Sequence, residues 1–222
     1  MATRPSPPQR ARERERELVK VTRALFDERG MQHAPVEEIA RAAGIARGLI
    51  YRSFSSKEEL FVLAVTDYLA ELGAALEAAT AGDADPALRL ERLTEAYARY
   101  CLRYPAFLDA CISLMHRPAR ELSEIVSESV WLRLGQGMAR CLEVSAAIVR
   151  DGADAGVFDV EDPDYTANVL WTQGLGLMHL ARIGVGVRSL APGIPALFTI
   201  EPEQIVRTCI ASALANVGAP RS

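Results

Sequence analysis

The sequence lacks the features that would anchor it in a membrane or send it out of the cell. No run of about 18 uninterrupted apolar residues occurs, as a membrane-spanning helix would need. The most apolar segment, residues 169–180, is interrupted by Thr172, Gln173 and His179. The first thirty residues are highly charged and have no apolar core of the signal-peptide type. We therefore expect a soluble protein that is cytoplasmic.

Cysteine and histidine are scarce and scattered. The four cysteines form no CxxC pair, and the three histidines show no metal-ligand spacing. This pattern predicts reduced cysteines in the core of an intracellular protein, with no metal site and no cofactor. The residues concerned are Cys101, Cys111, Cys141, Cys209, His33, His116 and His179.

Alternating β-branched runs are also missing, whereas apolar residues recur at helical spacing throughout. The sequence therefore predicts an all-α fold of about nine helices, three of them within the first sixty residues. Residues 1–11 contain three prolines and little apolar surface, which predicts a disordered leader. Pro118 is expected to open one long helix, and the stretch 184–199, rich in Gly and Pro, is expected to be a long loop.

Charge is distributed unevenly along the chain. Residues 1–60 carry 12 Lys or Arg and 9 Asp or Glu, whereas the remaining residues carry 13 and 20. A mildly basic head on an acidic body is typical of a DNA-contacting domain joined to a region that does not touch DNA. We predict three segments: the leader (1–11), a DNA-binding domain (12–58) and a helical body (59–222) that does not touch DNA.

Two short amphipathic helices within residues 36–54 have the pattern of a helix-turn-helix. Val36, Ile39 and Ala40 line the first, Ile50 packs the second, and Gly44 lies in the tight turn between them. The second helix carries basic and polar side chains at its start, the end that enters the major groove in such motifs. The residues predicted to contact DNA are Arg47, Gly48, Leu49, Tyr51, Arg52 and Lys57.

The run from Val36 to Leu60 resembles the signature of the TetR (tetracycline-repressor) family of transcription regulators. The matching features are Ile39-Ala40, Gly44-Ile45, Arg47-Gly48, Ile50-Tyr51, Phe54 and Ser56-Lys57-Glu58-Glu59-Leu60. Three positions depart from the usual family pattern. Ala46 replaces a side-chain N-cap, Leu49 replaces a common threonine, and Ser53 replaces a common aromatic residue. These departures bear on which operator is bound more than on the fold.

The resemblance implies a homodimer built from the last two long helices and a ligand cavity among the central ones. Apolar and small residues in the last two helices agree with a dimer surface, although a buried core helix has the same composition. The dimer residues predicted are Trp171, Leu175, Met178, Ile205, Cys209 and Ile210. The cavity residues predicted are Tyr97, Phe107, Cys111, Met115, Trp131, Met138, Trp171, Gln173 and His179. Few charges lie in these helices, so we expect a mostly apolar ligand.

The sequence thus predicts a sequence-specific DNA-binding transcription regulator. The resemblance further implies a repressor that a small molecule releases from a palindromic operator. Two alternatives remain open. An all-α enzyme finds no support in a nucleophile–base pair, and its candidate acids, Asp162 with Asp164 or Glu37 with Glu38, are typical of helix starts. A helical binding protein whose DNA-binding head has degenerated is suggested by Ala46, Leu49 and Ser53.

Overall fold

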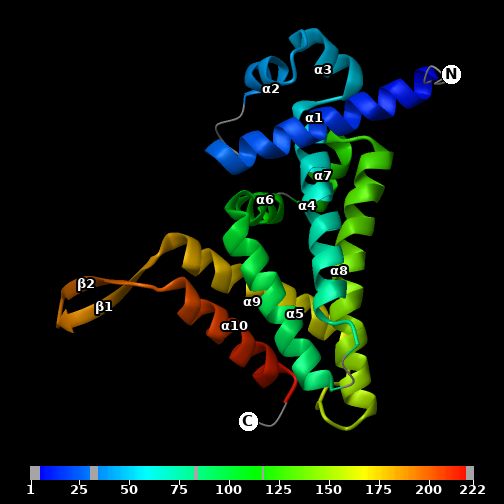
Figure 1. The fold of residues 1–222 in the computed structure, drawn as a ribbon. Coiled ribbons are helices and arrows are strands. Elements are labelled where there is room, and N and C mark those ends of the chain that lie inside the picture. Colours follow the sequence, from blue (N-terminus) through cyan, green and yellow to red (C-terminus); the bar gives the residue numbers. More distant parts are fainter. Residues whose placement is uncertain (1–5, 31–34, 83–84, 117, 219–222) are drawn as a thin grey trace. The chain divides into compact units, whose positions relative to one another are not determined.

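The computed structural model describes residues 6–30, 35–82, 85–116 and 118–218. They form ten helices and one antiparallel two-stranded sheet (Figure 1). The elements are α1 (Pro7–Arg29), α2 (Val36–Ala42), α3 (Arg47–Ser53), α4 (Lys57–Ala79), α5 (Pro86–Arg103), α6 (Pro105–Met115), α7 (Ala119–Ile125), α8 (Glu128–Asp154), α9 (Pro163–Ile183), β1 (Val185–Ala191), β2 (Ile194–Thr199) and α10 (Pro202–Asn216). The prediction of a helical fold is confirmed. None of the helices in the described ranges is long and apolar enough to cross a membrane.

The chain divides into two compact units, which we call the head unit and the body unit. The head unit comprises Met1–Ala70 and Asp109–Gly137, and the body unit comprises Glu71–Leu108 and Met138–Ser222. The helices α4 and α8 each contribute residues to both units. The domain boundary predicted after residue 58 is a functional division and stays a prediction.

In the head unit, α1 is fixed to α4 by apolar packing and by a polar cluster at its edge. Leu18, Phe26 and Leu60 are among the buried core residues. Arg23 Nη1 donates to Asp67 at 2.7 Å, and the Arg23 guanidinium lies 4.1 Å from the centre of the Tyr68 ring. The half-buried setting of this ion pair reduces the screening that weakens exposed ones. The pair therefore helps to fix α1, the scaffold on which α2 and α3 pack.

The body unit is built from α5, α9 and α10 together with the second half of α8. Side-chain caps start two of its helices, because Asp85 accepts from the Ala87 N–H and Asp162 accepts from the Tyr165 N–H. Proline follows each cap at a first-turn position, where its missing N–H costs no hydrogen bond. The position of Asp162 at the start of α9 agrees with the expectation that this acid marks a helix start.

Three local predictions were wrong. Residues 7–11 of the expected disordered leader are helical, because the Ser6 N–H donates to Gln9 Oε1 at 2.7 Å and proline at the first turn suits a helix start. The rest of that leader, residues 1–5, and His33 lie outside the described residues. The helix expected to run on from Pro118 is divided into α7 and α8 at Val126 and Ser127.

The third correction concerns residues 184–199, which form a β-hairpin rather than a loop. Gly184 ends α9 in the left-handed conformation, and its carbonyl accepts the Ile200 N–H at 3.0 Å, which closes the base of the hairpin. Pro192 and Gly193 lie between the paired residues Ala191 and Ile194, and a Pro-Gly pair suits the centre of a tight turn. The glycines and prolines that predicted a loop thus occupy the turn and the strand edges.

Candidate DNA-reading helix and ligand cavity

The two short helices α2 and α3 meet through a tight turn in the head unit. Gly44 adopts φ +66°, which a residue with a side chain rarely takes, and the Ile45 N–H donates to the Ala40 carbonyl at 3.0 Å. Ile39 and Ile50, one from each helix, are both 1% exposed. Burial of these side chains fixes the angle of α3 and leaves its opposite face in solvent.

The residues predicted to contact DNA lie on or beside that solvent face. Arg47, Gly48, Tyr51 and Arg52 are exposed on α3, and Lys57 is exposed at the first position of α4. Leu49 is half-buried, so only part of its side chain is accessible. Ala46 provides no side-chain cap for α3, as expected from its methyl group.

Arg47 is held within the helix-turn-helix by two neighbours. Its Nη1 lies 2.7 Å from Glu37 Oε1, and its guanidinium lies 5.6 Å from the centre of the Tyr51 ring. A hydrogen bond with Tyr51 and then the charge of Glu37 raise the pKa of Arg47 above its ordinary value. The side chain is 60% exposed, so the cation stays available at the surface while Glu37 competes for it.

The turn between α7 and α8 is joined to the start of α4 by a hydrogen-bonded carboxylate. Glu59 is buried, and its two oxygens accept from Ser127 Oγ and, at 2.6 Å, from Ser55 Oγ. Ser56 Oγ accepts from the Glu59 N–H at 3.0 Å and donates to the Ile125 carbonyl at 3.2 Å. Burial alone raises the pKa of Glu59, but the hydrogen bonds from Ser127 and Ser55 outweigh it and hold that pKa below its usual value. We call Ser55, Ser56, Glu59 and Ser127 the Glu59 cluster.

The Glu59 cluster includes a capping pattern at the start of α4. Ser56 and Glu59 form it, although the Glu59 carboxylate reaches Ser55 N–H rather than that of Ser56. Its bond to Ser127 could not be predicted, because the two residues are 68 positions apart. The cluster ties the start of α4 to the end of α7. Only Ser55 and Ser56 separate α4 from Phe54, the buried C-cap of α3.

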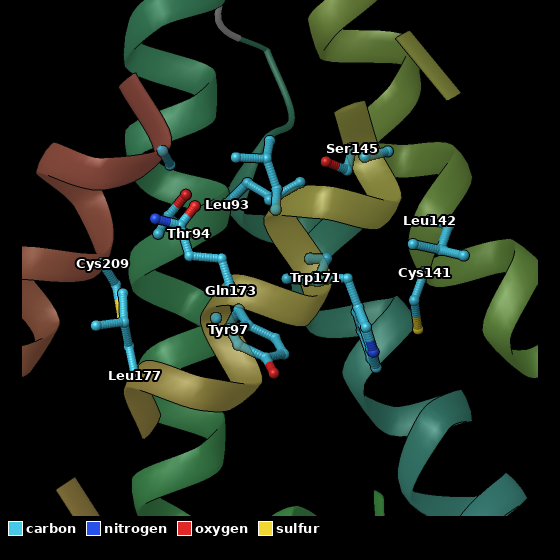
Figure 2. Close-up of a pocket in the computed structure, with 15 residues that line it drawn as sticks. Leu93, Thr94, Tyr97, Cys141, Leu142, Ser145, Trp171, Gln173, Leu177 and Cys209 are labelled. Atoms are coloured by element: carbon cyan, nitrogen blue, oxygen red, sulfur yellow. The ribbon is translucent and has the colours of Figure 1, made fainter. Parts of the chain in front are cut away.

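A cavity in the body unit is lined by α5, α8, α9 and α10 together with the end of α4 (Figure 2). The space between its lining atoms amounts to about 540 Å³, a figure that includes open solvent at its mouth. The lining residues are Leu76, Leu93, Thr94, Tyr97, Cys141, Leu142, Ser145, Ala167, Leu170, Trp171, Gln173, Gly174, Leu177, Cys209 and Ala213. No charged side chain is among them, which suits an uncharged ligand.

Aromatic and polar groups occupy distinct positions in this cavity. The rings of Tyr97 and Trp171 lie 5.3 Å apart between centres and are tilted by 53° (Figure 2). Ser145 Oγ is buried without a hydrogen-bond partner among the described residues. Burial raises the pKa of the Cys141 and Cys209 thiols to about 11, so both are neutral thiols near pH 7. The cavity thus offers an aromatic wall and one unused hydroxyl.

Three of the nine predicted cavity residues line this cavity, namely Tyr97, Trp171 and Gln173. The other six do not. Phe107 and Cys111 are buried elsewhere in the core, Met138 and Trp131 are half-buried outside the cavity, and Met115 and His179 are exposed. These six residues were predicted because they are large or apolar. Which helix faces surround the cavity, however, depends on how the helices pack. Leu93, Cys141 and Ser145 line the cavity but were not predicted. Leu93 lies four residues before the predicted Tyr97, and Cys141 lies four residues before Ser145, so each pair shares one helix face, and this spacing is the signal that points to them.

The residues predicted for the dimer surface are mostly core residues of the chain itself. Leu175, Met178, Ile205 and Cys209 are all at most 5% exposed, because α9 and α10 pack these faces inward. Trp171 lines the cavity, and Ile210 is half-buried. These six residues cannot supply most of a surface for a second copy. The outward face of α10 instead carries a shallow groove lined by Gln204, Arg207, Thr208, Ala211, Ser212 and Ala215.

Comparisons with known proteins agree with this arrangement. Residues 18–64 match the family model "Bacterial regulatory proteins, tetR family". The HTH-type transcriptional repressor KstR2 of Rhodococcus jostii (strain RHA1) is 31% identical over 153 residues, which is 67% of this chain and 71% of that protein. The HTH-type transcriptional regulator BetI of Proteus mirabilis is 33% identical over 84 residues, which covers 37% of this chain and 42% of BetI.

Solved structures share the fold at lower identity. A crystal structure of RolR in complex with resorcinol has a TM-score of 0.69 and 19% identity, and the match covers 96% of this chain and 91% of RolR. The family model covers the helix-turn-helix, and the match to KstR2 extends over two thirds of the chain. The chain therefore belongs to the tetR family of bacterial helix-turn-helix transcription regulators.

Proposed function

We propose that this regulator binds an inverted-repeat operator as a homodimer and represses transcription until a small, mostly apolar ligand enters the body cavity. The observation that carries the proposal is the exposed face of α3, where Arg47, Tyr51 and Arg52 project from a helix whose opposite face is locked by Ile50. A short helix fixed in this way presents its side chains to the major groove.

Each predicted contact residue has a distinct role in this proposal. Arg47 and Arg52 supply cations, with Arg47 at the start of α3 placed to reach base edges. Tyr51 and Lys57 contact phosphates, which set register and affinity rather than sequence. Gly48 allows close approach of the backbone, and the exposed part of Leu49 meets a thymine methyl group.

Two copies are needed, because one short reading helix makes few contacts and a dimer reaches two half-sites one helical turn apart. The outward face of α10 supports this part of the proposal. Thr208, Ala211 and Ala215 are exposed there at helical spacing, and small side chains allow a partner helix to approach closely. We assign the dimer contact to this face in place of the buried residues first predicted.

The cavity suits a ligand with an aromatic or other apolar ring system and at least one hydrogen-bonding group. Tyr97 and Trp171 offer ring contacts, and Ser145 Oγ offers a hydrogen bond that nothing in the described chain uses. RolR was crystallised with resorcinol, and the KstR2 structure from Mycobacterium tuberculosis is that of a ketosteroid transcriptional regulator. Resorcinol and a ketosteroid are therefore sensible first probes.

The helix α8 supplies a physical route between ligand and DNA. Its second half contributes Cys141 and Ser145 to the cavity, and the residue preceding its first turn, Ser127, binds Glu59 at the start of α4. A ligand that favours one position of α8 therefore biases the Glu59 cluster and, through it, the setting of α3. Coupling of this kind requires that the ligand bind the two states with different affinity.

The first test is selection of binding sites by the full chain from a random duplex pool at near-physiological salt. Enrichment of an inverted repeat is the expected result. A half-site without symmetry would reject the dimer, and no enrichment by folded protein would favour the degenerate-head alternative. With the operator in hand, a ligand that leaves operator affinity unchanged at saturation would reject the release mechanism.

The contact assignments are tested on the same operator. Lys57→Gln should weaken binding about equally for all sequences and reduce the slope of log K against log salt by about 1. Arg47→Ala should instead relax the base preference at one position of each half-site. Lys20→Gln, an exposed charge on α1, is the matched control and should change neither property.

A further inference from the structure

The β-hairpin between α9 and α10 is unusually apolar for an exposed element. Of the twelve large hydrophobic side chains exposed in the described residues, seven lie between residues 183 and 198. Val187 and Leu197 are each 69% exposed. Monomeric proteins rarely leave a contiguous apolar patch of this kind uncovered, and such patches mark interaction surfaces.

The strand register places three of these side chains, Val185, Val187 and Leu197, on one face. Val187 pairs with Leu197, and Ser189 pairs with Pro195. Because cross-strand partners point to the same side of a sheet, Val185, Val187, Pro195 and Leu197 share one side. We call this side the Val187 face.

The hairpin covers part of its opposite face by itself. The Phe198 ring lies over Gly186, where an added Cβ would come within 2.4 Å of the ring. Glycine at 186 is therefore required by this internal packing. No such cover exists for Val187 or Leu197, whose exposure remains high.

The hairpin stands away from the helices of the body unit, joined to them at its base (Figure 1). An isolated two-stranded hairpin is at best marginally stable in water. Its only charged side chain over residues 185–199 is Arg188, so it offers little to a charged partner. A partner surface that binds the Val187 face favourably must therefore be apolar and uncharged where it makes contact.

We propose that the Val187 face packs on a second copy of this chain, as an arm at the edge of the α10 dimer contact. The inference rests on the dimer of the proposed function. The hairpin leads directly into that contact, since only two residues separate the end of β2 from the start of α10. In a two-fold contact each copy then presents its arm to the other and receives an arm in return.

The test compares dimer dissociation constants of full-length proteins by sedimentation velocity. Val187→Lys with Leu197→Lys should raise the constant by at least about 100-fold, because two large apolar side chains lose their cover and two charges take their place. Far-UV circular dichroism should stay unchanged, since both side chains are largely exposed in the single chain. Leu132→Lys, which changes a 58% exposed leucine on α8, is the matched control and should dimerise normally.

A third variant separates this proposal from the dimer itself. Ala211→Arg places a large charge on the exposed face of α10 and should also produce monomers. If the Ala211→Arg variant is monomeric and the double lysine variant keeps the dissociation constant of the wild type, the proposed role of the hairpin is rejected and the proposed dimer is retained. If the wild type is itself a monomer at micromolar concentration, both are rejected.

Hydrogen exchange of the wild type supplies a readout that needs no substitution. Backbone amides of residues 185–199 should exchange more slowly at concentrations above the dissociation constant than below it. Exchange that is equally fast at both concentrations would overturn the arm, as would protection that appears only with an unrelated protein or with lipid vesicles.

Discussion

At the scale of single residues, we expect DNA affinity to depend on a competition for the guanidinium of Arg47. Glu37 holds Arg47 at 2.7 Å on the face proposed to meet DNA. Exposed ion pairs contribute little to stability, so their loss is tolerated. In a DNA complex the same carboxylate must give up the cation and also repels phosphate.

Glu37→Gln should therefore tighten operator binding by about 3- to 10-fold at low salt, a modest gain typical of one charge near the backbone. Fluorescence anisotropy across a salt series measures it. Glu28→Gln makes the same charge change beside Arg29 rather than Arg47 and should alter affinity much less. An equal gain in both variants would mean that only net charge matters.

Two glycines of α8 offer a matched test of packing. An added Cβ at Gly152 would lie 2.0 Å from the Phe158 ring, which is itself buried, whereas nothing lies within 4 Å of the same position at Gly135. Gly152→Ala should destabilise the protein by about 1–3 kcal/mol through overpacking. Gly135→Ala should stabilise it by up to about 1 kcal/mol through helix propensity. Urea unfolding measures both, and equal effects would contradict the packing described for Phe158.

At the scale of elements, the Glu59 cluster makes the junction of α4 with the α7–α8 turn sensitive to acid. The pKa of Glu59 is lower in the folded protein than in the unfolded chain, where it is near 4.5. Such a carboxyl stabilises the fold at pH values above the unfolded pKa. That contribution is lost as the pH falls below about 4.5 and through the folded pKa.

Glu59→Gln should lower the free energy of unfolding by about 1–3 kcal/mol at pH 7, since hydrogen bonds to a charged acceptor are lost. The difference from wild type should shrink between pH 5 and pH 3, as the wild type itself becomes protonated. Thermal unfolding across this range measures it. Glu58→Gln removes a charge in the same helical turn and should show no such convergence.

At the scale of the whole molecule, the proposed release mechanism requires that ligand and operator affect each other's binding reciprocally. The two tryptophans allow this to be measured, because Trp171 lines the cavity and Trp131 lies outside it. A ligand that enters the cavity should quench fluorescence in the Trp131→Phe variant and leave the signal of Trp171→Phe nearly unchanged. The opposite pattern would place binding outside this cavity.

The same titration in the presence of operator tests release. The factor by which saturating ligand weakens operator binding must equal the factor by which operator weakens ligand binding. We expect about 5- to 150-fold in each direction, the usual range of such coupling. Ser145→Ala should reduce ligand affinity by about 10-fold and leave operator affinity of the free protein intact.

The order of residues over short stretches of the sequence was enough to predict the helix-turn-helix. Gly44 between Ile39 and Ile50, the basic start of α3, and the Asp85 and Asp162 caps all act through neighbours within a few positions. Such features need no knowledge of the rest of the fold, so most of the helices and the helix-turn-helix were predicted correctly.

Tertiary structure alone decided the surfaces and the cavity. Leu175 and Met178 have the composition of an interface helix, yet α9 turns them into the core. Residues 184–199 contain glycine and proline as a loop does, yet cross-strand pairing makes them a hairpin with an exposed apolar face. Glu59 meets Ser127 across 68 positions. Burial, strand pairing and long-range hydrogen bonds depend on which faces meet in space, and the order of residues along the chain does not determine that by itself.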